Sequence, residues 1–374
     1  MLDDIFVIDG VAHCFDLSPS NFAHERYAAA VNGLLGAVIA AQGPGYDLDP
    51  KQIEKDWPVE DTANILFRES HTDAAVFHPL PIFFYKDGMS GFAKAVAATK
   101  RWPNRFIGSY VSVDPLRPDP LGEIERQFEL LDRPFGLKVY PVGYVDGRVV
   151  PWRMDDPKVG FPLYEKAREL GMTSIAVHKS MPLGPAPSGD AFHPRDVEGA
   201  AQAFPELTFS IVHGGMAFTE ETAWLLARFQ NIWVNLETFN VIISQRSRLF
   251  AEILAQMVTI GGEDVIHRLY WGTGTMNSHA RPGLEAFGNF EFPDDILERT
   301  GMFFSVPQLS HEHKRAILGG NLARLHGLDV AELARAVADD EFVRDPNGLL
   351  PAPYSTTSVS DAVMTPFPGE VVLA

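Results

Sequence analysis

Four histidines stand at the carboxyl ends of short apolar runs, where their side chains could bind a metal ion or transfer protons. They are His13, His78, His178 and His213. Imidazole is a common ligand of zinc and similar ions, and its charge changes near neutral pH. One histidine at the end of a strand is more often a hydrogen-bonded structural residue than a ligand. Four of them at four strand ends favour a shared site, provided that the strands converge.

The elements around these histidines predict that convergence. Eight runs rich in β-branched and aromatic residues recur along the chain, and most are followed by a segment with helical spacing. This alternation is typical of βαβ units and a parallel sheet. Because no glycine-rich dinucleotide turn is present, it favours an α/β fold of the (β/α)8 TIM-barrel type over a doubly wound sheet. The predicted strands are Ile5–Ala12, Asp73–His78, Phe106–Val113, Gly136–Tyr140, Thr173–His178, Thr208–His213, Ile232–Leu236 and Arg268–Gly272.

Other polar residues are predicted at the same end of the barrel, where the carboxyl ends of all strands meet. Lys138, in the fourth strand, would be a cation beside the histidines. His279 and Arg281 lie in the loop after the eighth strand, and Arg281 could bind a substrate carboxylate through two hydrogen bonds. An exposed histidine and a surface ion pair are the plain alternatives for these two. We interpret Lys138, His78, His279 and Arg281 as candidate substrate-binding residues.

Additional segments enlarge the predicted barrel. An insertion at about residues 17–60 follows the first strand and carries a helical stretch from Glu25 to Ala41. A Pro- and Gly-rich loop, Pro182–Pro194, follows the fifth strand on the side where barrel active sites lie. We therefore expect one barrel domain over residues 1–328. Residues 329–374 would form a C-terminal helical extension and tail packed on the barrel.

Composition narrows the class of function. The 374 residues carry a formal net charge of −18, which disfavours a nucleic-acid partner. The single cysteine, Cys14, cannot form an intramolecular disulfide, which fits a reducing compartment. The acidic N-terminus is unlike a signal peptide, and no apolar run approaches the ~18 residues of a membrane span. We expect a soluble, cytoplasmic protein with a small-molecule substrate and no membrane partner.

At these residues the sequence resembles the amidohydrolase superfamily. It is most similar to the branch that includes aminocarboxymuconate-semialdehyde decarboxylase and the resorcylate decarboxylases. The resemblance runs from about Ile5 to Leu328 and depends on the order of its motifs rather than on any single one. Besides the first strand with its Ile-Asp and His13, the motifs are Gly136–Pro141, Ala176–His178, Val212–Gly215 and Ile317–Leu325.

The resemblance implies a divalent ion, usually zinc, and assigns roles to three histidines. In the family the ion is held by a His- or Glu-x-His pair on strand one, a His on strand five and an Asp on strand eight. By position, His13 and His178 match metal ligands, and His213 matches the strand-six acid/base residue. Val11 replaces the first residue of the pair, and Gly274 stands at the Asp position. A closed zinc site generally needs at least three protein ligands.

These two departures leave three hypotheses open. Other residues could replace the lost ligands; the candidates are Asp9, Asp16, His78, Glu237 and His279. The site could instead work without a metal, or the barrel could bind a ligand without catalysis. The resemblance implies a non-oxidative decarboxylase-like carboxy-lyase for a carboxylated cyclic or conjugated acid, with His213 as acid/base beside His13 and His178. The alternative is a hydrolase of an ester, lactone, amide or carbon–carbon bond. Barrels of this family usually associate, so we expect a homodimer or a higher homo-oligomer.

Overall fold

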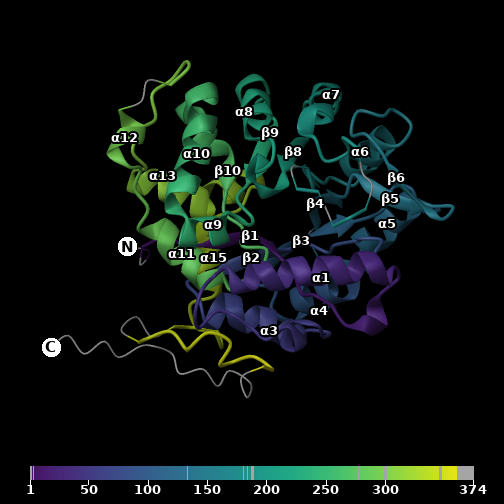
Figure 1. Ribbon diagram of the computed structural model, residues 1–374, viewed down its shortest axis with the longest axis horizontal. Helices are drawn as coiled ribbons and strands as arrows, with labels where there is room; N and C mark the ends of the chain where they lie inside the picture. The colour runs from purple at the N-terminus through teal and green to yellow at the C-terminus, as the bar shows by residue number, and fades with distance from the viewer. Residues whose placement is uncertain are drawn as a thin grey trace.

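Most of the strands form one parallel sheet at the centre of the molecule (Figure 1). The computed structural model describes residues 2, 4–132, 134–179, 181–182, 184–186, 189–276, 278–298, 301–344 and 348–359. Within these ranges the sheet has eight strands in the order β1-β2-β3-β4-β7-β8-β9-β10. The bounds are β1 (Ile8–Ala12), β2 (Ala74–Phe77), β3 (Phe106–Ser112), β4 (Pro134–Val139), β7 (Ser174–Val177), β8 (Thr208–Ile211), β9 (Ile232–Asn235) and β10 (Leu269–Tyr270). Each lies within about two residues of its predicted run, except that β1 and β10 are shorter.

The sheet curves until its first and last strands meet. Backbone hydrogen bonds of 2.9 Å join Gly10 N to Trp271 O and Gly274 N to Val11 O. A β-carbon at Gly10 would lie 2.6 Å from the Tyr270 ring, so glycine permits this approach. The nearly closed parallel sheet, flanked by helices, confirms the predicted (β/α)8 barrel.

Helices surround the strands and bury their outer faces (Figure 1). Local sequence starts several of them. For example, the Asp119 carboxylate accepts a hydrogen bond from Gly122 N at the start of α5, where Pro120 suits the first helical turn. The bounds are α1 (Glu25–Ala40), α2 (Pro50–Ile53), α3 (Val59–Ala63), α4 (Phe92–Arg101), α5 (Pro120–Leu130), α6 (Gly160–Glu169), α7 (Val197–Ala203), α8 (Thr219–Arg228), α9 (Phe239–Gln245), α10 (Ser247–Gly261), α11 (Ala280–Gly288), α12 (Asp294–Leu297), α13 (His311–Arg315), α14 (Asn321–Leu325) and α15 (Val330–Ala336). In the described part of the chain, no helix has the length and apolarity needed to cross a bilayer.

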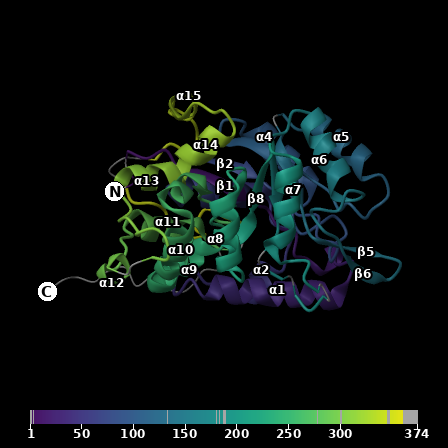
Figure 2. The same cartoon turned by 90° about the horizontal axis from the view of Figure 1, so that it is seen from above.

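Helices α1 and α15 cover opposite ends of the barrel, with the strands between them (Figure 2). Val330 and Leu333 of α15 pack against the apolar interior at the amino ends of the strands. The helix of the predicted C-terminal extension ends at Ala336, and Arg105 pairs with Asp340 just beyond it. The final residues of the chain lie outside the described residues.

A short hairpin after β4 is an addition that the strand pattern did not predict. Strands β5 (Val142–Val145) and β6 (Arg148–Pro151) pair antiparallel around Asp146-Gly147. Both turn residues have positive φ, as an Asp-Gly hairpin turn requires. Tyr144 of this hairpin packs on His24 and Phe83, with ring centroids 4.1 and 5.5 Å apart. The hairpin, the start of α1 and the loop after β2 therefore form one aromatic cover at the carboxyl end of the barrel.

Candidate active site

Three of the predicted histidines and one glutamate form a connected cluster at the carboxyl ends of the strands. His13, His178 and His213 follow β1, β7 and β8, and Glu237 follows β9. His213 Nε2 lies 3.0 Å from His178 Nδ1. Glu237 lies between two rings, with Oε1 3.4 Å from His13 Nε2 and Oε2 3.8 Å from His213 Nδ1. All four side chains are at least 97% buried.

Hydrogen bonds fix which nitrogen of His178 and His213 carries the proton. His178 Nε2 lies 3.0 Å from the Met181 carbonyl, which can only accept, so Nε2 donates. Burial holds the pKa of His178 well below its usual range, so its Nδ1 is an acceptor and His213 Nε2 must donate to it. The remaining nitrogen, His213 Nδ1, then accepts from the Thr238 hydroxyl at 3.0 Å. Both rings are therefore held in one tautomer.

His13 has a different environment, because both of its ring nitrogens face oxygen acceptors. Nδ1 lies 2.8 Å from the His78 carbonyl, and Nε2 faces the Glu237 carboxylate. Thus both nitrogens of His13 face acceptors, whereas His213 is held as a neutral ring.

Burial and charge set the ionisation of the cluster. Burial would raise the pKa of the Glu237 carboxyl, but His213 and His13 outweigh it and lower that pKa, so Glu237 is an anion. Burial lowers the pKa of His213 to about 4, although Glu237 opposes the shift. The site therefore combines an anion with a neutral imidazole near neutral pH, which is an arrangement able to accept and return a proton.

Two strained backbone positions hold this cluster. His213 and Thr238 have φ of +62° and +70°, in the left-handed region that non-glycine residues rarely adopt. The side chains of these two residues hydrogen-bond to each other. Strain of this kind, about 1–3 kcal/mol per residue, concentrates at functional sites.

His78 and Lys138 lie on the neighbouring side of the interior. The His78 ring stacks on Tyr110 with centroids 4.1 Å apart and lies 6.3 Å from the His13 ring. Lys138, on β4, is 1% exposed, and its Nζ lies 5.4 Å from the centroid of the Tyr140 ring. Burial lowers the pKa of Lys138 to about 8, with Glu237 opposing the shift. The charge of Lys138 also acts on His78, His178 and His213.

The residues present do not fit a divalent metal ion. Val11 offers no donor and points into the apolar interior. Gly274, at the position of the family's aspartate, has no side chain and offers no ligand. Both nitrogens of His178 are already committed to hydrogen bonds, as described above. In the part of the chain that the structure describes, no three His, Cys, Asp or Glu side chains are grouped so that they could hold a metal.

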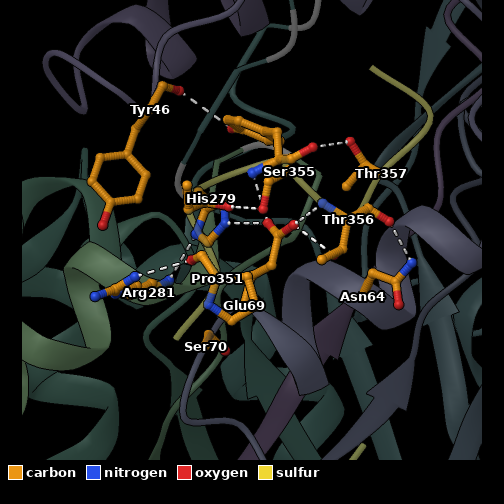
Figure 3. Close-up of polar contacts among 12 residues, drawn as sticks. Tyr46, Asn64, Glu69, Ser70, His279, Arg281, Pro351, Ser355, Thr356 and Thr357 are labelled. Carbon is orange, nitrogen blue, oxygen red and sulfur yellow. Dashed lines mark hydrogen bonds and ion pairs between the residues drawn. The ribbon is translucent and has the colours of Figure 1, made fainter. Parts of the chain in front are cut away.

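His279 and Arg281 belong to a separate network at the C-terminal segment (Figure 3). His279 is fully buried, and its Nε2 lies 3.0 Å from Glu69 Oε2. Arg281 pairs with Glu285 at 2.8 Å and donates to Pro351 O. The backbone of Thr356 also donates to Glu69. None of the contacts found among the described residues joins His279 or Arg281 to the histidine cluster, so this network anchors the segment at residues 351–356.

Sequence reasoning named Glu237 only as a replacement metal ligand and did not predict its position between two histidines. Glu237 directly follows the seventh predicted strand, and this position alone could have indicated a residue of the active site. Two other replacement candidates, Asp9 and Asp16, are already engaged in hydrogen bonds. Asp9 accepts hydrogen bonds from Val11 N and Thr273 N in the seam between β1 and β10, and Asp16 bonds to Ser18.

The comparisons with known proteins agree with this fold. The amidohydrolase family profile matches residues 27–328, more than half of the chain. The chain belongs to the amidohydrolase family. No curated protein matches it.

Several solved structures share the barrel. An uncharacterised TIM-barrel protein from Bordetella bronchiseptica is 16% identical, with a TM-score of 0.58 over 88% of this chain and 100% of that one. The 5-carboxyvanillate decarboxylase of Novosphingobium aromaticivorans, solved with manganese and a nitrobenzoic acid, is 13% identical, with a TM-score of 0.54 over 87% of this chain and 98% of that one. A probable 2-pyrone-4,6-dicarboxylic acid hydrolase from Acinetobacter baumannii, solved with citric acid, is 15% identical, with a TM-score of 0.50 over 86% of this chain and 99% of that one.

Proposed function

We propose that this amidohydrolase-family protein is a non-oxidative carboxy-lyase for a carboxylated cyclic or conjugated acid. The observation that carries the proposal is the buried cluster in which Glu237 lies between His13 and His213. Such a cluster can hold a proton away from solvent and deliver it to carbon. A decarboxylase of the same fold adds support for this reaction class. Because similarity of fold alone does not establish a function, the proposal depends on the cluster.

In the proposed reaction, a proton from the cluster adds to the carbon that carries the carboxylate. The bond from that carbon to the carboxylate then breaks, and its electron pair returns to the ring or conjugated system. Carbon dioxide leaves, and the cluster regains a proton from solvent. His213 is the acid/base group, and His178 orients it through the hydrogen bond at 3.0 Å. The Glu237 carboxylate lies beside His13 and would stabilise positive charge that forms on the cluster during the reaction.

A metal is not needed for these steps. The manganese in the 5-carboxyvanillate decarboxylase makes a divalent cofactor plausible for a barrel of this fold. The donors in this chain do not fit such an ion, so no step passes through one. The zinc site at His13 and His178 remains a prediction of the family resemblance. Elemental analysis of protein purified without chelator tests it, because near-stoichiometric zinc or manganese would restore a metal role.

The test of the acid/base role is a His213→Asn variant. Asparagine tolerates a positive φ better than alanine does, so this change removes the imidazole with the least backbone strain. Wild type and variant would be assayed for carbon dioxide release from a panel of carboxylated aromatic and conjugated acids, including 5-carboxyvanillate and 2,6-dihydroxybenzoate. We expect the variant to lose about 10²–10⁴-fold in rate while its circular dichroism is unchanged. Unchanged turnover would refute the role of His213.

A hydrolase is the second candidate, because a probable lactone-cleaving hydrolase shares the fold. Isotopes separate the two reactions. A lyase places deuterium from D2O on the product carbon, whereas a hydrolase places oxygen from H2(18)O in a new carboxylate or hydroxyl. Tight binding without turnover across the panel would instead identify a catalytically silent barrel. The expected homodimer is tested by sedimentation of the purified protein.

A further inference from the structure

Lys138 is a buried cation that forms no ion pair with another described residue, although the charge of Glu237 acts on it. Its side chain enters the interior from β4, between Ser112 of β3 and Ala176 of β7 in the register of the sheet. Among the described residues, none accepts a hydrogen bond from Nζ or forms an ion pair with it; its one contact of this kind is with the Tyr140 ring. A buried charge without a partner is costly, so its presence calls for an explanation.

Another buried lysine shows the ordinary solution. Lys179, directly after the His178 position, is fully buried like Lys138. Its Nζ lies 2.8 Å from the Asp196 carboxylate and also donates to the Ala191 carbonyl. The chain therefore pairs one interior ammonium fully and leaves the other without a partner.

A second unsatisfied group lies beside Lys138. Both ring nitrogens of His78 are buried, and neither makes a hydrogen bond of good geometry among the described residues, although the Gly10 backbone lies close enough to act on the pKa of His78. His78 follows β2, Lys138 belongs to β4, and the intervening strand β3 supplies Tyr110, which stacks on His78. The neutral ring of His78 has one N–H to donate. Hence an ammonium and an imidazole donor lie near each other in the interior, where the charge of Lys138 acts on His78 and the charge of Glu237 acts on both.

A carboxylate of the ligand would satisfy both groups. It would neutralise the Lys138 ammonium and accept the N–H of His78, while the rest of the ligand reached the histidine cluster. The 5-carboxyvanillate decarboxylase of this fold was solved with manganese bound. A metal does not fit this chain, because Val11 and Gly274 offer no ligand and the nitrogens of His178 are already hydrogen-bonded. Lys138 provides a fixed positive charge instead.

We propose that Lys138 and His78 form the subsite for the substrate's carboxylate, and that this ammonium makes carboxylate binding independent of a divalent metal ion. The inference rests on the proposed function in one respect, which is the identity of the carboxylic acid that serves as substrate. The subsite itself would recognise the carboxylate of any acid that fits the interior.

The test uses benzoate and its neutral counterpart benzamide as probes of the full-length, chelator-treated protein in isothermal titration. The variants are Lys138→Met, which keeps the length of the side chain, and His78→Phe, which keeps the stacking on Tyr110. Lys100→Met, the same change on the exposed face of α4, is the matched control.

We expect benzoate to bind at least tenfold more tightly than benzamide. Lys138→Met should weaken benzoate binding at least tenfold and leave benzamide binding unchanged, His78→Phe should weaken benzoate binding to a smaller extent, and Lys100→Met should behave as wild type. Added manganese chloride should not change the benzoate affinity. Wild-type protein that fails to bind benzoate at millimolar concentrations, benzoate binding that requires manganese, or unchanged affinity in Lys138→Met would each overturn the inference.

These outcomes are distinct from failure of the proposed lyase. Benzoate binding through Lys138 with no decarboxylation across the acid panel would refute the lyase and leave the subsite standing. Decarboxylation by the wild type, together with unchanged benzoate affinity in Lys138→Met, would support the lyase and refute the subsite.

Discussion

Removing the buried ammonium of Lys138 should stabilise the folded protein at neutral pH. Methionine at this position has a similar length and shape but carries no charge, so Lys138→Met deletes the cost of burying the ammonium and leaves little cavity. The substitution would thus raise stability while it weakens carboxylate binding. A substitution that raises stability and weakens binding is typical of a functional group that is held in an unfavourable environment.

The magnitude follows from the pKa of Lys138. Burial lowers it from the ordinary value of 10.5 to about 8. At about 1.4 kcal/mol for each pH unit, the charged form is disfavoured in the folded chain by about 3 kcal/mol. Because the folded pKa lies below the unfolded one, the unfolded chain binds more protons between pH 8 and 10.5. The penalty is therefore complete below pH 8 and disappears as the pH rises toward 10.5.

Urea unfolding of the wild type, Lys138→Met and Lys100→Met at a series of pH values from 7 to 10 measures this effect. At pH 7 we expect Lys138→Met to be more stable than wild type by up to about 3 kcal/mol. The advantage should shrink as the pH rises, whereas Lys100→Met should follow the wild type throughout. A Lys138→Met protein that is less stable at pH 7, or an advantage that does not change with pH, would show that the ammonium is neutralised in the folded protein.

Other residues give three further predictions. Glu237→Gln removes the anion between His13 and His213 and should lower turnover by about 10²–10⁴-fold; a rate within a factor of two of wild type would exclude an electrostatic role for Glu237. Burial lowers the pKa of His326 from 6.5 to about 3, so the unfolded chain binds the additional proton as the pH falls below 6.5. His326→Phe should therefore gain about 2 kcal/mol over wild type at pH 5 and much less at pH 7.5, as measured by urea unfolding; an equal difference at both pH values would contradict this. Glu69→Ala leaves His279 and the donors of the C-terminal segment unpaired, and it should expose that segment to limited proteolysis before the barrel is cut; cleavage at the wild-type rate would show that other contacts hold the segment.

Strand positions were readable from sequence because each strand is a local pattern. The runs before His78, His178 and His213 combine β-branched and aromatic residues with flanking helical segments, and the barrel topology then places their ends together. The hairpin around Asp146-Gly147 carried an equally local signal, an Asp-Gly turn between alternating residues, and this signal was overlooked.

The partners of each polar side chain were not readable in this way. Glu237 and His13 are far apart in sequence, and their contact depends on how the barrel twists. His279 lies in the expected loop, yet its ring turns toward Glu69, 210 residues away in the chain. Lys138 was correctly assigned to a strand, but the absence of a partner for its ammonium is a property of the packed interior alone.

The seam that closes the barrel has a consequence for synthesis on the ribosome. The Asp9 carboxylate accepts hydrogen bonds from Thr273, 264 residues later in the chain. At about 5–20 residues per second, β1 is complete on the order of ten seconds to a minute before its neighbour β10 emerges. During that interval one edge of the nascent sheet has no partner strand, and its unpaired backbone is a template for aggregation. The yield of soluble protein during expression should therefore depend more strongly on chaperones and on translation rate than the stability of the folded protein would suggest.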